Sequence, residues 1–67
     1  MSIEPAQARA EEDFLAEFSV NKEMGNYEGV FQVLQRMRVL EYHDLAAEFL
    51  KKLTVNEAKL VALYGTN

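Results

Sequence analysis

A chain of 67 residues is long enough for one domain only, because so short a chain cannot bury two separate hydrophobic cores. Hydrophobic residues make up 49% of it and charged residues 27%, a balance typical of globular proteins and unlike that of disordered ones. The chain has a net charge of −4 and no cysteine, which excludes disulfides and thiolate metal sites. With a single histidine, His43, we expect no metal and no cofactor.

The chain shows no sign of a membrane segment. No apolar run approaches the roughly 18–20 residues that span a bilayer, and the first residues lack the basic and hydrophobic regions of a signal peptide. We therefore expect a single cytoplasmic domain over residues 1–67. Below about 70–80 residues one core rarely supplies more than about 3–5 kcal/mol, so we expect oligomerisation to add stability. A monomeric bundle that is stable by itself is the alternative.

The first predicted helix begins at Pro5, whose missing N–H costs nothing in the first turn of a helix. Strong helix formers follow, and Phe14 and Phe18, four residues apart, form one apolar stripe. After Phe18 the pattern weakens, and residues 19–26 are compatible with either a helix or a hinge. The sequence leaves this choice open.

The second predicted helix follows a stop at Gly25 and has Asn26 as its N-cap. From residue 27 to residue 40 the apolar side chains recur at helical spacing. Residues 41–44 contain neither glycine nor proline, so the second and third helices are either separated by a short turn or fused into one rod. We favour the short turn.

The third and fourth predicted helices are short. Residues 45–53 carry an apolar face with charged residues outside it. Thr54 and Glu57 have the spacing of a capping box, in which each side chain bonds the other's backbone N–H, and Gly65 marks the end of the fourth helix. The sequence thus predicts an all-α fold, a compact and oligomeric bundle of three to four short helices.

Only one group of residues suggests acid–base or metal chemistry. His43 and Asp44 are adjacent, with Glu48 nearby, but neighbouring residues on a helix point about 100° apart and do not converge. A nucleophilic serine or threonine needs a base within hydrogen-bond reach in a pocket that excludes water, and so short a chain has little room for one. The glycines form no phosphate-binding loop. We therefore predict no enzymatic activity, no catalytic residue and no small-molecule substrate.

Two features indicate protein partners. The second helix is apolar over a broader arc than one core contact needs, which favours a second contact with another copy or with a larger protein. The first helix is acidic, because residues 1–28 carry a net charge of −5 and residues 29–67 a net charge of +1. The predicted partner-binding residues are Tyr27, Val30, Phe31 and Leu34 on the second helix and Glu11, Glu12, Asp13 and Glu17 on the first.

The function expected from these features is that of a non-enzymatic interaction module, a homodimeric regulator, adaptor or inhibitor of a larger protein. Its apolar helix face would bind the partner, and its acidic helix would guide the encounter. One alternative is a dimeric DNA-associated regulator that faces phosphate with Arg36, Arg38, Lys51 and Lys52, although the acidic balance disfavours nucleic acid. The other alternative is a purely structural helical subunit.

Overall fold

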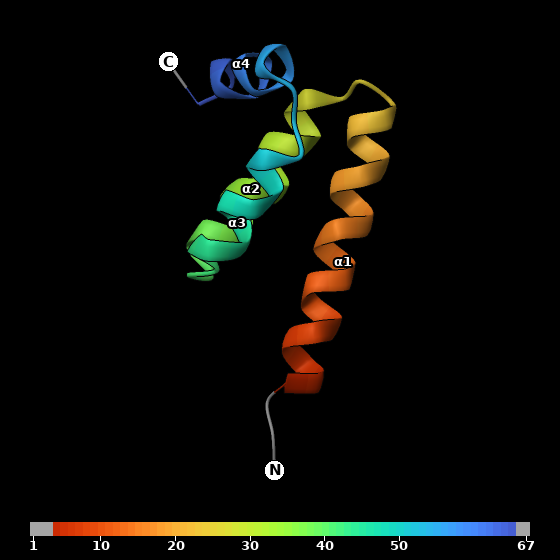
Figure 1. Ribbon diagram of the computed structural model, residues 1–67, viewed down its shortest axis with the longest axis vertical. Helices are drawn as coiled ribbons and strands as arrows, with labels where there is room; N and C mark the ends of the chain where they lie inside the picture. Colours follow the sequence, from red (N-terminus) through yellow and green to blue (C-terminus); the bar gives the residue numbers. More distant parts are fainter. Residues whose placement is uncertain (1–3, 66–67) are drawn as a thin grey trace.

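The computed structural model describes the backbone of residues 4–65 and the side chains of residues 9–65, and all regular structure within this part of the chain is helical. The helices are α1 (Glu4–Glu23), α2 (Tyr27–Val39), α3 (His43–Lys51) and α4 (Val55–Leu63). The first three run alternately up and down, and α4 lies across one end of them (Figure 1). The predicted all-α fold is confirmed, with four helices where three to four were predicted, and the oligomeric state stays a prediction.

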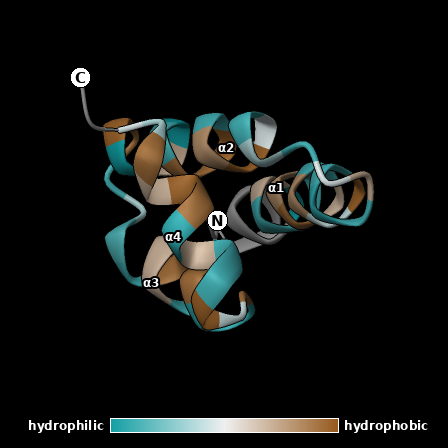
Figure 2. Cartoon of the chain, turned by 90° about the horizontal axis from the view of Figure 1, so that it is seen from above, coloured by the Kyte–Doolittle hydropathy of each residue, from teal (hydrophilic) through white to brown (hydrophobic). Residues whose placement is uncertain are grey.

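Helix α2 is the centre of the fold, because α1, α3 and α4 each pack against it. Seen from above, α1 and α3 lie on different sides of α2, and α4 crosses over the end of the bundle (Figure 2). The buried residues of α2 are Val30, Val33, Leu34 and Met37. The broad apolar arc of this helix is therefore covered by neighbours within the same chain.

Aromatic side chains join α1 to α3 beside α2. The rings of Phe18 and Phe49 lie 5.0 Å apart between centroids, and those of Phe14 and Tyr42 lie 6.0 Å apart in an edge-to-face arrangement. These are the separations at which aromatic pairs attract beyond their buried area. The apolar stripe predicted on the first helix is thus the face that α1 turns to the core.

The turn between α1 and α2 follows the local sequence signals. The Asn26 N–H donates to the Asn21 carbonyl at 2.8 Å and the Gly25 N–H to the Lys22 carbonyl at 3.1 Å, the pattern of a Schellman motif. Gly25 has a φ of 73°, which glycine adopts without a steric cost. Asn26 then caps α2 by accepting a hydrogen bond from the Gly29 N–H. The predicted stop and cap are confirmed.

The turn between α2 and α3 uses the same motif without glycine. The Tyr42 N–H donates to the Met37 carbonyl at 2.8 Å, and the Glu41 N–H donates to the Arg38 carbonyl at 3.0 Å. The left-handed position is occupied by Glu41, with a φ of 69°. The favoured short turn is confirmed. No glycine marks this turn in the sequence, because Glu41, an L-residue, occupies the left-handed position.

Replacing Glu41 with glycine is expected to stabilise the protein. A left-handed conformation costs an L-residue roughly 1–2 kcal/mol, and the greater freedom of glycine in the unfolded chain offsets part of this gain. We expect the free energy of unfolding to rise by about 0.5–1 kcal/mol in urea denaturation. Gly25→Ala, at the equivalent position of the first turn, should lower it by about 1 kcal/mol. A less stable Glu41→Gly variant would contradict this account.

Candidate protein-binding surface

Helix α4 is held at its first turn by one carboxylate. The Thr54 hydroxyl accepts from the Glu57 N–H at 3.1 Å, and Glu57 Oε1 accepts from the Thr54 N–H at 2.9 Å, so the predicted capping box is confirmed. Glu57 Oε2 accepts a hydrogen bond from the Tyr27 hydroxyl at 3.2 Å. Since Tyr27 begins α2, this carboxylate ties the first turn of α4 to the first turn of the central helix.

The same contacts shift two pKa values. The Thr54 backbone N–H holds the pKa of Glu57 below its ordinary value, with further help from the Tyr27 hydroxyl and Lys22, although desolvation acts in the opposite direction. Desolvation, followed by the charge and hydrogen bond of Glu57, raises the pKa of Tyr27. The folded state therefore favours a charged Glu57 beside a neutral Tyr27.

This pairing predicts an acid-dependent loss of stability. A carboxylate with a lowered folded-state pKa contributes stability that is fully present above its ordinary pKa, about 4.3 for glutamate, and is lost as the pH falls through the folded value. Glu57→Gln should therefore flatten the fall in unfolding free energy below about pH 4.3 in urea titrations at successive pH values. Glu48→Gln, on the exposed face of α3, is the matched control. Equal slopes for Glu57→Gln and the wild type would refute the assignment.

The outer face of α4 is apolar and exposed. Of the helix's residues only Val61 is buried, whereas Leu60 is 43% and Leu63 64% exposed. Val55 and Tyr64, at the two ends of the helix, are exposed as well. A helix that is apolar all round normally has neighbours on every side. Here the bundle covers one side of α4, and the opposite side is open to contact.

Two adjoining hollows follow α4. A groove of about 330 Å³ runs between α2, α3 and α4, and we call it the α2–α4 groove. Its walls include Phe31, Leu34, Arg38, Leu50, Ala58 and Val61. A shallower hollow of about 610 Å³, the outer α4 surface, is lined by Asn56, Lys59, Leu60, Ala62 and Leu63. Ala62 also lines the α2–α4 groove, so the two hollows form one continuous and largely apolar surface.

The structure shows where the four partner-binding residues predicted on the second helix lie, and their role in binding stays a prediction. Val30 is 0% and Leu34 1% exposed, so both belong to the core, and Leu34 also lines the α2–α4 groove. Tyr27 and Phe31 are half-buried and pack against the core. A Cβ added at Gly65 would stand 3.1 Å from Phe31 Cε1, which shows how closely the end of α4 approaches this ring. Part of the apolar side of α2 is covered by α4, because that helix folds back across α2.

The four predicted acidic residues of α1 are exposed but are not gathered on one face. Consecutive residues on a helix point about 100° apart, so Glu11, Glu12 and Asp13 are spread around α1. Glu17 forms an ion pair with Arg36 of α2 at 3.2 Å, which fixes two exposed side chains within the chain. Asp13 and Glu17, four residues apart, lie on the same side of α1, and the predicted role of these acids in guiding a partner stays a prediction.

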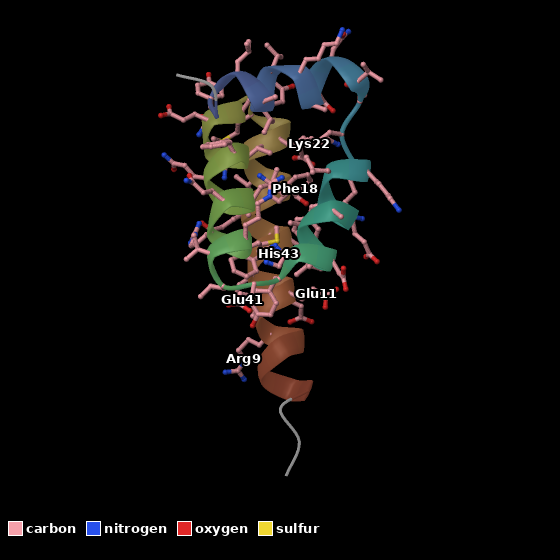
Figure 3. The ribbon with its side chains drawn as sticks, turned by 90° about the vertical axis from the view of Figure 1, so that its left-hand side faces the viewer. Arg9, Glu11, Phe18, Lys22, Glu41 and His43 are labelled. Atoms are coloured by element: carbon pink, nitrogen blue, oxygen red, sulfur yellow. The ribbon has the colours of Figure 1, made fainter. Side chains whose placement is uncertain are left out.

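A third hollow, of about 360 Å³, lies where α1 passes the turn between α2 and α3. It is lined by Glu11, Glu41, Tyr42, His43, Asp44 and Leu45. Figure 3 shows Glu11, Glu41 and His43 near this turn, with α1 continuing past it toward Arg9. Within the side chains that the structure describes, no three acidic or histidine residues are arranged to hold a metal ion. The carboxylates of Glu11, Glu41 and Asp44 that line this hollow carry the same charge and repel one another. Among the described side chains they are not arranged to bind one ligand together.

The basic residues considered for DNA binding are separated by the fold. Arg36 faces α1, where it pairs with Glu17 and lies 5.9 Å from the centroid of the Phe14 ring. Arg38 lines the α2–α4 groove on another side of α2. Lys51 and Lys52 lie at the end of α3. Binding to a phosphate backbone requires several lysine or arginine side chains on one surface, and these four residues do not form such a surface within one chain.

Together these features define a small four-helix protein with an apolar surface formed by α4 and the adjoining groove. Comparison with protein-family models, curated protein sequences and solved structures gives no match. None of the helices in residues 4–65 has both the length and the apolar character needed to cross a membrane.

Sequence reasoning missed the outer α4 surface, although a signal for it was present. Leu60, Val61 and Leu63 lie close together in the sequence, so they cannot all point to one side of a helix. With Val55 and Ala62 they place apolar residues on more than one side of α4, between Asn56, Glu57 and Lys59. This pattern indicates a helix with two contact faces, and it is more pronounced on α4 than on α2.

Proposed function

We propose that this chain is a small, non-enzymatic protein–protein interaction module that binds a larger protein through the outer α4 surface and the α2–α4 groove. One observation carries the proposal, namely the exposure of apolar side chains on the side of α4 that faces away from the bundle. Burying a leucine side chain fully is worth about 1.5–3 kcal/mol. Covering Leu60 and Leu63 by a partner would recover part of that free energy.

The surroundings of α4 set this surface apart from other exposed apolar residues. Val20, Met24, Val39 and Leu40 are also exposed, but they line neither the groove nor the outer α4 surface. Val20 and Met24 share one side at the end of α1, and Val39 and Leu40 are consecutive at the end of α2, but neither pair lines either apolar hollow, whereas an apolar patch beside a groove is typical of an interaction site. The location of the patch thus favours binding over chance exposure.

The chemistry of the two hollows supports binding rather than catalysis. Neither is lined by a serine, threonine, cysteine, histidine, aspartate or glutamate. A nucleophile with an adjacent base, or an acid–base pair, requires residues of these types within hydrogen-bond reach of one another. An apolar groove with few polar groups is the arrangement that accepts a helix or a side chain of another protein.

The proposal is tested by site-specific crosslinking in the cells that produce the protein. A photoreactive amino acid at Asn56, which lines the outer α4 surface, should give a discrete crosslinked adduct, because a bound partner would lie over it. The same amino acid at exposed Ala16 of α1 is the position control. Adding Leu60→Glu should remove the Asn56 adduct while circular dichroism shows an intact fold. Absence of any adduct from Asn56 would refute the proposal.

The homodimer predicted from the sequence is one form that this function could take. It would have to use α4, because the apolar arc of α2 is covered within the chain. Sedimentation equilibrium over a concentration series measures it directly. A mass that doubles with concentration, and returns to that of one chain in Leu60→Glu, would identify the partner as a second copy. A constant mass of one chain would leave a different protein as the partner.

A further inference from the structure

The charged residues around the proposed binding surface are all of one sign. Arg38 lines the α2–α4 groove and Lys59 lines the outer α4 surface, and no acidic residue lines either hollow. The chain as a whole has 11 acidic residues against 7 lysines and arginines. Although the chain as a whole is acidic, the charged residues that line the two hollows are basic, and we call these two residues the basic rim.

The side chains of Arg38 and Lys59 are accessible to carboxylates of a partner. Among the residues that the structure describes, one ion pair forms, between Arg36 and Glu17. Within the same residues, neither Arg38 nor Lys59 has a carboxylate within ion-pair distance. Both residues are exposed. An arginine at the edge of an apolar groove can bind a carboxylate through two parallel hydrogen bonds, and the apolar surroundings strengthen such a contact.

The shape of the surface favours a helix as the occupant. Phe31 and Leu50 lie in the groove, Leu60 lies on the outer side of α4, and Ala62 lines both hollows, so the apolar surface is continuous. An amphipathic helix fits such a surface by presenting large apolar residues at spacings of three, four and seven. The residues that flank its apolar stripe would then come close to Arg38 and Lys59.

We infer that the occupant is an amphipathic helix of a larger protein, with apolar anchor residues in the α2–α4 groove and on the outer α4 surface, and with aspartate or glutamate flanks that pair with Arg38 and Lys59. This inference rests on the proposed function and names the chemistry of its partner. The basic rim excludes lysine-rich and arginine-rich segments, because like charges would be brought together at an apolar contact.

A second copy of the chain fits this surface less well. In a symmetric dimer each residue meets its own equivalent or a reciprocal neighbour. Lys59 lies at the middle of the nine-residue helix α4, so packing α4 on its symmetry mate would bring the two Lys59 ammonium groups close together. The acids of α1 that could pair with them are spread around that helix rather than flanking one apolar stripe.

The test uses two designed helical peptides with the same leucine and phenylalanine stripe, one flanked by glutamates and the other by lysines. Binding to the full chain is followed by NMR titration. The glutamate peptide should bind at least about tenfold more tightly, with chemical-shift changes concentrated at Phe31, Leu50 and Ala62. In the Arg38→Glu, Lys59→Glu double variant the preference should reverse. The Lys51→Glu, Lys52→Glu variant changes the net charge equally, at residues that line neither hollow, and should keep the original preference.

Several results would overturn the inference. Equal affinity for the two peptides would show apolar adhesion without charge recognition, and failure of both to bind would exclude a helix of this kind. NMR chemical-shift changes centred on other residues would place the peptide-binding site elsewhere on the chain. Self-association that Arg38→Glu abolishes would make the occupant a second copy. If adducts from Asn56 persist while any of these results is found, the proposed function stands and only the acidic helical partner is wrong.

Discussion

Phe18→Ala is expected to leave the protein largely unfolded at room temperature. Phe18 is 1% exposed, and its ring packs against Phe49 at the junction of α1 and α3. Removing a buried phenylalanine side chain costs about 3–5 kcal/mol, which is comparable to the whole stability that a core of this size supplies. Far-ultraviolet circular dichroism should show a large loss of helicity at 25 °C, and the cooperative thermal transition should disappear.

The control for Phe18→Ala is Leu15→Ala on the same helix. Leu15 is 39% exposed, so its removal should lower the unfolding free energy by no more than about 1 kcal/mol and leave the transition cooperative. Both substitutions replace a large apolar residue by alanine at a helical position, so the comparison isolates burial. A Phe18→Ala variant with a transition midpoint near that of the wild type would show that the contact with Phe49 contributes little.

Phe31→Ala is expected to loosen α4 from the rest of the fold. Phe31 is half-buried on α2, lines the groove beside Val61, and closely approaches Gly65. We expect a loss of about 2 kcal/mol, less than the 3–5 kcal/mol of a fully buried phenylalanine because part of the ring already faces solvent. Amide hydrogen exchange should accelerate first in α4, while α1 and α2 keep more of their protection.

Gln32→Ala, at an exposed position next to Phe31, is the matched control and should leave both stability and exchange unchanged. The Phe31 experiment also decides between two roles for this side chain. If Phe31→Ala left stability and exchange as in the wild type but abolished partner binding, Phe31 would belong to the partner surface, as the sequence suggests. Loss of α4 protection would assign it to the packing of α4 on α2.

The proposed binding surface depends on how α4 is docked. The α2–α4 groove exists only while α4 lies across α2, and Glu57, Tyr27 and Phe31 hold it there. Variants of these residues are therefore expected to weaken partner binding indirectly, in proportion to the fraction of molecules in which α4 is undocked. Leu60, Arg38 and Lys59 are exposed and carry none of the core packing, so their substitutions test binding with little effect on the fold.

Local interactions explain most of what the sequence predicted about the helices. The Gly25 turn, the Asn26 cap and the Thr54 and Glu57 capping box each join residues only a few positions apart, so residue type and spacing are enough to predict them. The turn at Glu41 gave no such signal. There the chain adopts a left-handed conformation without glycine, and a steric cost accepted at one residue cannot be read from composition.

The binding surface depended on tertiary structure for a different reason. Helical periodicity showed that Val30, Phe31 and Leu34 share an apolar side of α2, and it did so correctly, but periodicity does not tell which neighbour covers that side. The direction in which α4 crosses the bundle decided that Val30 and Leu34 are buried, that Phe31 is half-buried at the groove and that Leu60 faces outward. The sequence by itself determined the all-helical class and, through short-range bonds, the turn at Gly25 and the start of α4 at Thr54. The choice between core and surface was made only by the long-range packing of one apolar helix against another.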